Sequence, residues 1–146
     1  MKSHKSAVFH LSIHVHDLDA SRAFYAGVLG CREGRSTSSW VDFDFFGHQL
    51  SLHLGTVTST SLTGKVDGVP VPMPHFGAVL PAETWKAAEA QLRTAGVEFI
   101  LDPQQRYADD SGSQHTLFVV DPSGNAIELK SMQNDAELFE PTPHAT

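Results

Sequence analysis

The sequence predicts an α+β protein built from two copies of one βαβββ module, and three observations support this. First, His10 and His75 each open the same local pattern, a strand-like alternation followed by an amphipathic helix. Second, each helical pattern ends at a glycine, Gly30 or Gly96, a residue that commonly follows a helix. Third, each half continues with short segments typical of strands. The two histidines lie almost half of the 146-residue chain apart, as an internal repeat requires.

The first module is expected at about residues 8–55. Residues 9–16 alternate apolar and polar side chains, which is the two-residue period of a half-buried strand. Asp17 or Asp19 caps the next helix, whose apolar stripe consists of Ala20, Ala23, Phe24, Gly27 and Val28. The remaining elements are a weakly marked strand at about 32–38, the strand WVDFDFF, a turn at Gly47-His48 and the strand QLSLHL.

Residues 56–74 are rich in Thr, Ser, Gly and Pro, which is typical of a linker between the halves. The second module, at about 75–131, repeats the order of the first. Its strands are HFGAVL, VEFIL ended by Pro103, QHTLFVV and NAIELKS, with a polar loop at 104–114 and a DPSG turn. Its helix has an apolar stripe of Trp85, Ala88, Leu92 and Ala95. Residues 132–146 are expected to form a poorly ordered tail.

Composition narrows the class of protein. The net charge of −7 and the scattered basic residues argue against a nucleic-acid partner and against an anionic membrane surface. The single cysteine, Cys31, excludes an internal disulfide and fits a reducing cytoplasm. No signal peptide and no apolar stretch long enough for a membrane span are evident. We therefore expect a cytoplasmic, acidic, soluble protein.

The polar faces of the strands predict where a binding site lies. Each module has an apolar face that it cannot bury alone, so two curved mixed sheets are expected to combine with helices outside and a cleft inside. The polar positions that would line this cleft are His10, Ser12 and His14, then Gln49, Ser51 and His53, and finally Glu128 and Lys130. Two imidazoles, His10 and His75, and the carboxylate of Glu128 make a site for a divalent metal.

These motifs resemble the vicinal oxygen chelate superfamily, which includes glyoxalases, extradiol dioxygenases, fosfomycin-resistance enzymes and bleomycin-binding proteins. The resemblance rests on His10 with HVHDLDASRAFYAGVLGC, on His75 in PHFGAVL, and on DPSGNAIELK with Glu128. It covers about residues 8–131, nearly the whole chain. It implies paired βαβββ modules around a metal-binding cleft.

The resemblance also implies which positions ligate the metal. Ligands come from the first and last strands of each module, so His10, His75 and Glu128 are expected to bind Fe, Mn, Ni, Co or Zn. The fourth position has two candidates, because aligning Gly47 with Gly124 matches Ser51 to Glu128, whereas His53 is the better ligand chemically. With His53 a lyase or isomerase is favoured. Without it, an open 2-His-1-carboxylate triad favours iron(II) oxygenase chemistry.

Further residues are candidates for the substrate. His14 and Ser51 lie on the polar strand faces. Arg106 lies in the 104–114 loop, from which it could bind a carboxylate of the substrate. His115 could act as an acid or base. Glu128 is a candidate catalytic base through temporary release from the metal.

The leading functional hypothesis is a metal-dependent enzyme, a dioxygenase or a lyase or isomerase, that binds a small substrate through vicinal oxygens. The alternative is a metal-free small-molecule or antibiotic-binding protein like the bleomycin-resistance proteins. Those proteins generally lack the ligand set, so His10, His75 and Glu128 favour the enzyme. A homodimer is the expected assembly.

Overall fold

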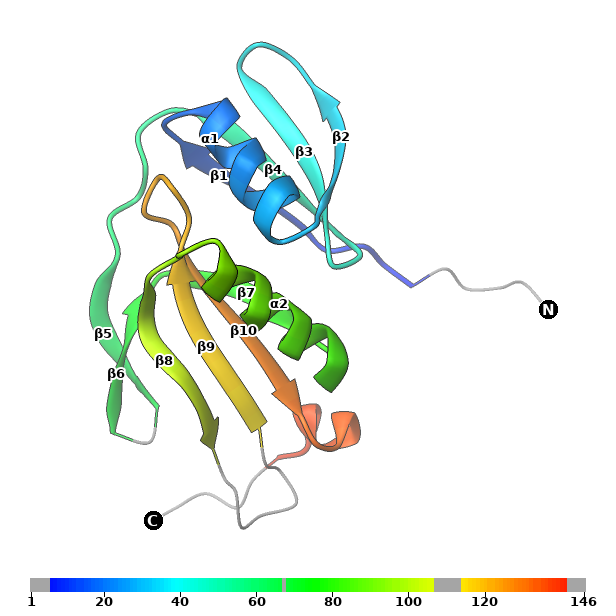
Figure 1. Ribbon diagram of the computed structural model, residues 1–146, viewed down its shortest axis with the longest axis vertical. Coiled ribbons are helices and arrows are strands. Elements are labelled where there is room, and N and C mark those ends of the chain that lie inside the picture. The colour runs from blue at the N-terminus through cyan, green and yellow to red at the C-terminus, as the bar shows by residue number, and fades with distance from the viewer. Residues whose placement is uncertain (1–5, 67, 107–113, 142–146) are drawn as a thin grey trace, which may run out of the picture. The chain divides into compact units, whose positions relative to one another are not determined.

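The computed structural model describes residues 6–66, 68–106 and 114–141. The chain forms two compact units, and Figure 1 shows the elements of each. Unit 1 comprises Met1–Pro74 together with Asp121–Asn125, and unit 2 comprises His75–Val120 and Ala126–Thr146. Each unit contains one βαβββ module, as the sequence predicts.

Unit 1 carries a four-stranded sheet in the order β1-β4-β3-β2. The outer pair β1–β4 is parallel, and the other two pairs are antiparallel. The β3–β4 turn consists of Phe46 and Gly47, both with positive φ, rather than Gly47 and His48. His48 instead begins a strand and pairs with Phe45. The strands are β1 (His10–Val15), β2 (Arg32–Ser36), β3 (Trp40–Phe45) and β4 (His48–Leu54).

The helical segment of unit 1 begins as α1 (Leu18–Arg22) and continues as the π-helix η1 (Ala23–Val28). Asp17 caps it by accepting a hydrogen bond from the Ala20 amide, which decides between the two predicted caps. Of the predicted apolar stripe, Phe24 is buried, Ala20 and Val28 are half-buried, and Ala23 and Gly27 are not buried. The wider π turn shifts the helical phase, so Ala23 and Gly27 are exposed. The buried positions are Leu18, Ser21, Phe24, Tyr25 and Leu29.

The DPSGN turn between β9 (Gln114–Val120) and β10 (Ala126–Met132) belongs to unit 1 and holds a buried polar cluster. Asp121 accepts hydrogen bonds from the Tyr25 hydroxyl, the amides of Ser123 and Asn125, and the Asn125 side chain. The Asn125 side chain also donates to the carbonyl of His14 at the end of β1. The turn therefore fixes the strand that carries the polar residues of module 1.

The segment predicted as a plain linker contains a β-hairpin. Strands β5 (Ser61–Val66) and β6 (Val69–Met73) pair antiparallel in their own two-stranded sheet. Its prolines, at positions 70 and 72, lie in a strand with only one partner, where a missing amide donor can face away from the ladder. The composition of this segment therefore concealed a pair of edge strands.

Unit 2 repeats the topology with the sheet order β7-β10-β9-β8. Figure 1 shows α2 (Ala82–Thr94) lying over this sheet, and its Trp85 indole donates to the carbonyl of Leu129. The stripe of Trp85, Ala88 and Leu92 is buried as predicted, but Ala95 is exposed at the helix end. The strands are β7 (His75–Val79), β8 (Phe99–Arg106), β9 (Gln114–Val120) and β10 (Ala126–Met132).

The sequence predicts that strand β8 ends at Pro103, but the strand continues to Arg106. It is an edge strand, so a proline without an amide donor can be accommodated there. The register shifts between Leu101 and Gln104, which marks an irregularity around the proline. Residues 104–106 are therefore strand, and residues 107–113 of the predicted loop lie outside the described residues.

The segment predicted as a poorly ordered tail from residue 132 contains regular structure. Strand β10 runs to Met132, and the short 3₁₀-helix η2 (Asp135–Phe139) follows it. Residues 142–146 lie outside the described part of the chain. In the parts of the chain that the structure describes, no helix combines the length and apolar character needed to cross a membrane.

Candidate functional site

Two of the predicted metal ligands lie together in unit 2. His75 begins β7 and Glu128 lies on β10, the parallel neighbour of β7, where Ala126 is the register partner of His75. The His75 Nε2 lies 3.9 Å from Glu128 Oε2. The imidazole also packs edge-on against Phe118, with ring centroids 5.1 Å apart. Both side chains are largely buried, so an imidazole and a carboxylate are held side by side.

Gly77 is the register partner of Glu128 and lets the two strands approach closely. A Cβ built on Gly77 would overlap the carbonyl oxygen of Glu128. Any side chain here would therefore push β7 away from β10. The absence of a side chain at this position is thus a condition for the His75–Glu128 pair.

Lys130 and Thr116 lie on the same sheet face as Glu128. The Lys130 ammonium is 3.8 Å from Glu128 Oε1, so the two carboxylate oxygens have different nitrogen neighbours. Thr116 is the register partner of Lys130 and is buried. Among the described residues its hydroxyl has no hydrogen-bond partner. This face therefore presents an imidazole, a carboxylate, an ammonium and an unsatisfied hydroxyl.

The strand register gives module 1 the same arrangement of positions. His10 pairs with Gln49 in β1–β4, as His75 pairs with Ala126 in β7–β10. Ser51 lies two residues beyond Gln49, as Glu128 lies two residues beyond Ala126. His10 is thus the counterpart of His75, and Ser51 is the counterpart of Glu128.

The two candidates for the fourth ligand have different surroundings. The buried Ser51 hydroxyl donates a hydrogen bond to Asp42 Oδ1. His53 lies two register pairs further along, opposite His14, and its ring centroid lies 6.1 Å from that of Trp40. His53 is therefore displaced along the strand from the position that Glu128 occupies in module 2.

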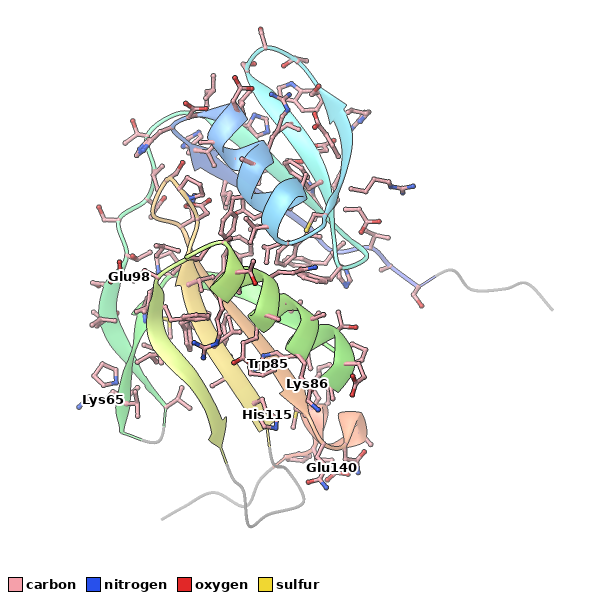
Figure 2. All side chains as sticks on the ribbon, in the orientation of Figure 1. Lys65, Trp85, Lys86, Glu98, His115 and Glu140 are labelled. Carbon is pink, nitrogen blue, oxygen red and sulfur yellow. The ribbon has the colours of Figure 1, made fainter. Side chains whose placement is uncertain are left out.

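The remaining predicted substrate residues are in different environments. His14 Nδ1 lies 2.9 Å from the carbonyl oxygen of Thr56, and its ring covers Gly55, so it is tied to the chain after β4. His115 pairs with Ser131 in the β9–β10 ladder, so its side chain lies on the opposite face of the sheet from Glu128. Its ring centroid lies 5.3 Å from that of Trp85, on the α2 side of the sheet (Figure 2). Arg106 ends β8, and its side chain lies outside the described residues.

Asp42 is a buried polar residue for which the sequence predicted no role. This carboxylate is buried and accepts hydrogen bonds from Ser51, Gln49 and Arg35. The alternation of WVDFDFF places Asp42 on the polar strand face. The same alternation is expected whether that carboxylate is buried or exposed to solvent, so the sequence does not distinguish the two. Its three partners lie on two other strand segments, and only the observed register brings them together.

Among the described residues, no three side chains of His, Cys, Asp or Glu form a group that could hold a metal. The donor chemistry of the predicted set nevertheless fits a first-row divalent ion, since imidazole and carboxylate are its ordinary ligands. His75 and Glu128 supply two such donors from one face of unit 2. His10, at the equivalent position of unit 1, carries a further imidazole of the kind that binds such ions.

Cys31 is not suited to be a nucleophile. Burial raises the pKa of its thiol to about 12, and the nearby carboxylate of Asp44 adds to the shift. We expect native protein to resist alkylation by iodoacetamide at pH 8 and to react fully in guanidinium chloride, because only the thiolate is nucleophilic. The protonated thiol contributes to the stability of the folded state in full at pH values below its ordinary pKa. This contribution is lost as the pH rises toward the raised pKa of about 12. Rapid labelling of the native protein would contradict this assignment.

The repeated topology and the equivalent strand positions define an α+β protein of paired βαβββ modules, the architecture of the vicinal oxygen chelate superfamily. The model of the Glyoxalase/Bleomycin resistance protein/Dioxygenase superfamily matches residues 7–129. The chain belongs to this superfamily.

Solved structures agree with this assignment. A glyoxalase/bleomycin resistance protein/dioxygenase from Alicyclobacillus acidocaldarius is 30% identical with a TM-score of 0.71, over 91% of this chain and 96% of that one. The genomically encoded fosfomycin resistance protein FosX from Listeria monocytogenes is 20% identical, over 87% and 93%, with a TM-score of 0.63. A lactoylglutathione lyase from Agrobacterium tumefaciens is 16% identical, over 95% and 100%, with a TM-score of 0.61. The last two show the fold alone. No curated protein matches the sequence.

Proposed function

We propose that this protein is a metal-dependent enzyme that binds a small substrate through vicinal oxygens at a divalent ion held by His10, His75 and Glu128. The observation that supports it is the His75–Glu128 pair, 3.9 Å apart on adjacent parallel strands. His10 occupies the corresponding register position of module 1. Together these side chains make a 2-His-1-carboxylate set that leaves coordination positions open for substrate.

We propose Ser51, rather than His53, as the residue at the fourth position, where it does not ligate the metal. Its register matches that of Glu128, and its hydroxyl is already committed to Asp42. A three-residue set favours oxygenase chemistry over a lyase or isomerase with four protein ligands. His115 lies on the α2 side of its sheet and is not part of the proposed site.

The roles of this chain's residues follow from their placement. When bound, a divalent ion would act as a Lewis acid that stabilises negative charge on the substrate oxygens. The Phe118 ring packs against His75 and restricts its rotation. The ammonium of Lys130 lies 3.8 Å from the second oxygen of Glu128, Oε1, and this oxygen is the candidate to accept a substrate proton. The Thr116 hydroxyl, which has no hydrogen-bond partner within the described ranges, can donate to a substrate oxygen on this face.

Metal content tests the proposal. Reconstituted protein should hold about one Fe, Mn, Ni, Co or Zn per chain, and His10→Ala, His75→Ala and Glu128→Gln should each lose it by elemental analysis. His16→Ala, which removes an exposed imidazole, should retain it, as should Ser51→Ala. A wild-type protein that holds no metal after reconstitution would overturn the enzyme proposal and leave the metal-free binding protein.

The same variants test the proposed homodimer. If two chains share each site, mixing unfolded His10→Ala and His75→Ala chains and refolding them should restore metal binding, since the mixed dimer regains one intact ligand set. Light scattering should then report twice the 15.9 kDa chain mass. Recovery of no metal, with each variant alone still folded, would place all ligands of a site in one chain.

A further inference from the structure

We propose that a cleft on unit 1 binds the carboxylate group of a small molecule, with the guanidinium of Arg35 as the recognition group. The cleft has a volume of about 300 Å³, which is at the lower end of the range for small-molecule sites. The polar and glycine residues that line it are Gly34, Arg35, Asp42, Asp44, Gly47, His48 and Gln49.

A β-bulge aims Arg35 at this cleft. In the β2–β3 ladder Glu33 pairs with Phe43 and Ser36 pairs with Val41, so two residues of β2 face Asp42 alone. Such a bulge changes the direction in which a side chain leaves its strand, and bulges of this kind are common beside functional sites.

The Arg35 guanidinium is oriented although it is exposed. Its Nη2 donates to Asp42 Oδ2 at 3.3 Å, and its Cζ lies 5.8 Å from the Trp40 ring centroid. The Asp42 side chain is only 8% exposed, whereas that of Arg35 is 79% exposed. A buried carboxylate and an aromatic face thus fix the group from the protein side. The guanidinium has five N–H donors, and among the described contacts one is used.

The chemistry of the cleft favours a singly charged carboxylate. A guanidinium edge matches the two oxygens of a carboxylate in a bidentate pair. His48 adds a donor, because its Nδ1 accepts a hydrogen bond from the Phe9 amide and leaves the proton of the neutral ring on Nε2. Asp44 also lines the cleft, and its negative charge opposes a phosphate dianion more than a monoanion.

The cleft adjoins His10, the proposed metal ligand of unit 1, through one residue pair. Gln49 lines the cleft and is the register partner of His10 on the neighbouring strand. The identification of the bound molecule as the substrate rests on the proposed function. On that basis the substrate is a small carboxylic acid that also carries vicinal oxygens.

The test uses the full metal-free chain and two probes of the same shape, phenylacetate and the neutral phenylacetamide. In ¹H–¹⁵N NMR titrations phenylacetate should shift the Gly34 and Gly47 amides and the Trp40 indole saturably, and phenylacetamide should not. Arg35→Gln should weaken binding of phenylacetate at least about tenfold. Arg32→Gln is the matched control, since Arg32 lies on the same strand, is 87% exposed and is 3.8 Å from Asp44; it should change binding less than about twofold.

Three results would overturn the inference: no saturable shift in the wild type, equal binding of both probes, or equal weakening by the two arginine variants. If Arg35→Gln fails to fold, Arg35→Lys keeps the charge without the fork and should still weaken binding. Because the titration needs no metal, its outcome is independent of the metal content of the His10, His75 and Glu128 variants. Failure of this inference and failure of the proposed enzyme are therefore distinguishable.

Discussion

Gly77→Ala is expected to lower the free energy of unfolding by about 3 kcal/mol or more and to abolish metal binding. A Cβ at this position would occupy the place of the Glu128 carbonyl oxygen, so β7 and β10 must separate. Backbone atoms cannot rotate away as the end of a long side chain can. The parallel ladder that places His75 beside Glu128 would be lost with the contact.

Gly27→Ala is the matched control for this prediction. Gly27 lies in η1, and a Cβ there would meet nothing within 4 Å. This change should be neutral or stabilise the protein by up to about 1 kcal/mol, because alanine favours a helix more than glycine does. Thermal and urea unfolding measure both variants. If Gly77→Ala unfolds like the wild type, then β7 and β10 do not approach as closely as the structure shows.

The modular fold could be predicted from the sequence because half-buried strands require alternation. His10 and Ser12 alternate with buried or half-buried neighbours along β1, and this pattern predicted the strand. The equivalence of Ser51 and Glu128 was also predictable, since Gly47 and Gly124, both at turns with positive φ, lie the same number of residues before them.

The features that could not be predicted from the sequence depend on contacts between elements and on irregular backbone geometry. Pro103 indicated a strand end, but an edge strand needs amide donors on one side only. The π-helix changed the phase of a helix whose stripe was predicted with a regular period, so the buried Tyr25 was missed. Asp42 and Arg35 meet because of a bulge, which a single strand pattern does not reveal.

Asp121→Ala is expected to lower the free energy of unfolding by more than about 4 kcal/mol. The substitution leaves several buried donors without an acceptor, and each unsatisfied donor costs about 1–3 kcal/mol. The Asp121 carboxylate accepts from the Tyr25 hydroxyl, from the amides of Ser123 and Asn125, and from the Asn125 side chain, each at 2.9 Å. Without it the turn loses the contacts that also hold Asn125 against the His14 carbonyl. Urea unfolding measures the loss, and Asp19→Ala, at a largely exposed carboxylate, should change stability by less than about 1 kcal/mol.

Tyr25→Phe separates the hydroxyl from the rest of this cluster. It removes one donor and leaves the three bonds from the turn, so we expect a loss of about 1–2 kcal/mol, well below that of Asp121→Ala.

Burial, and then the charge of Asp121, raise the pKa of Tyr25 well above its ordinary value, so the hydroxyl remains a donor. Its contribution is complete below that ordinary value, about 10, and declines as the pH rises beyond it. Wild type should therefore lose stability above pH 10 more steeply than Tyr25→Phe, and parallel pH profiles would show that the Tyr25–Asp121 bond does not form. Because the cluster fixes the end of β1, it also determines how firmly the strand that bears His10 is held.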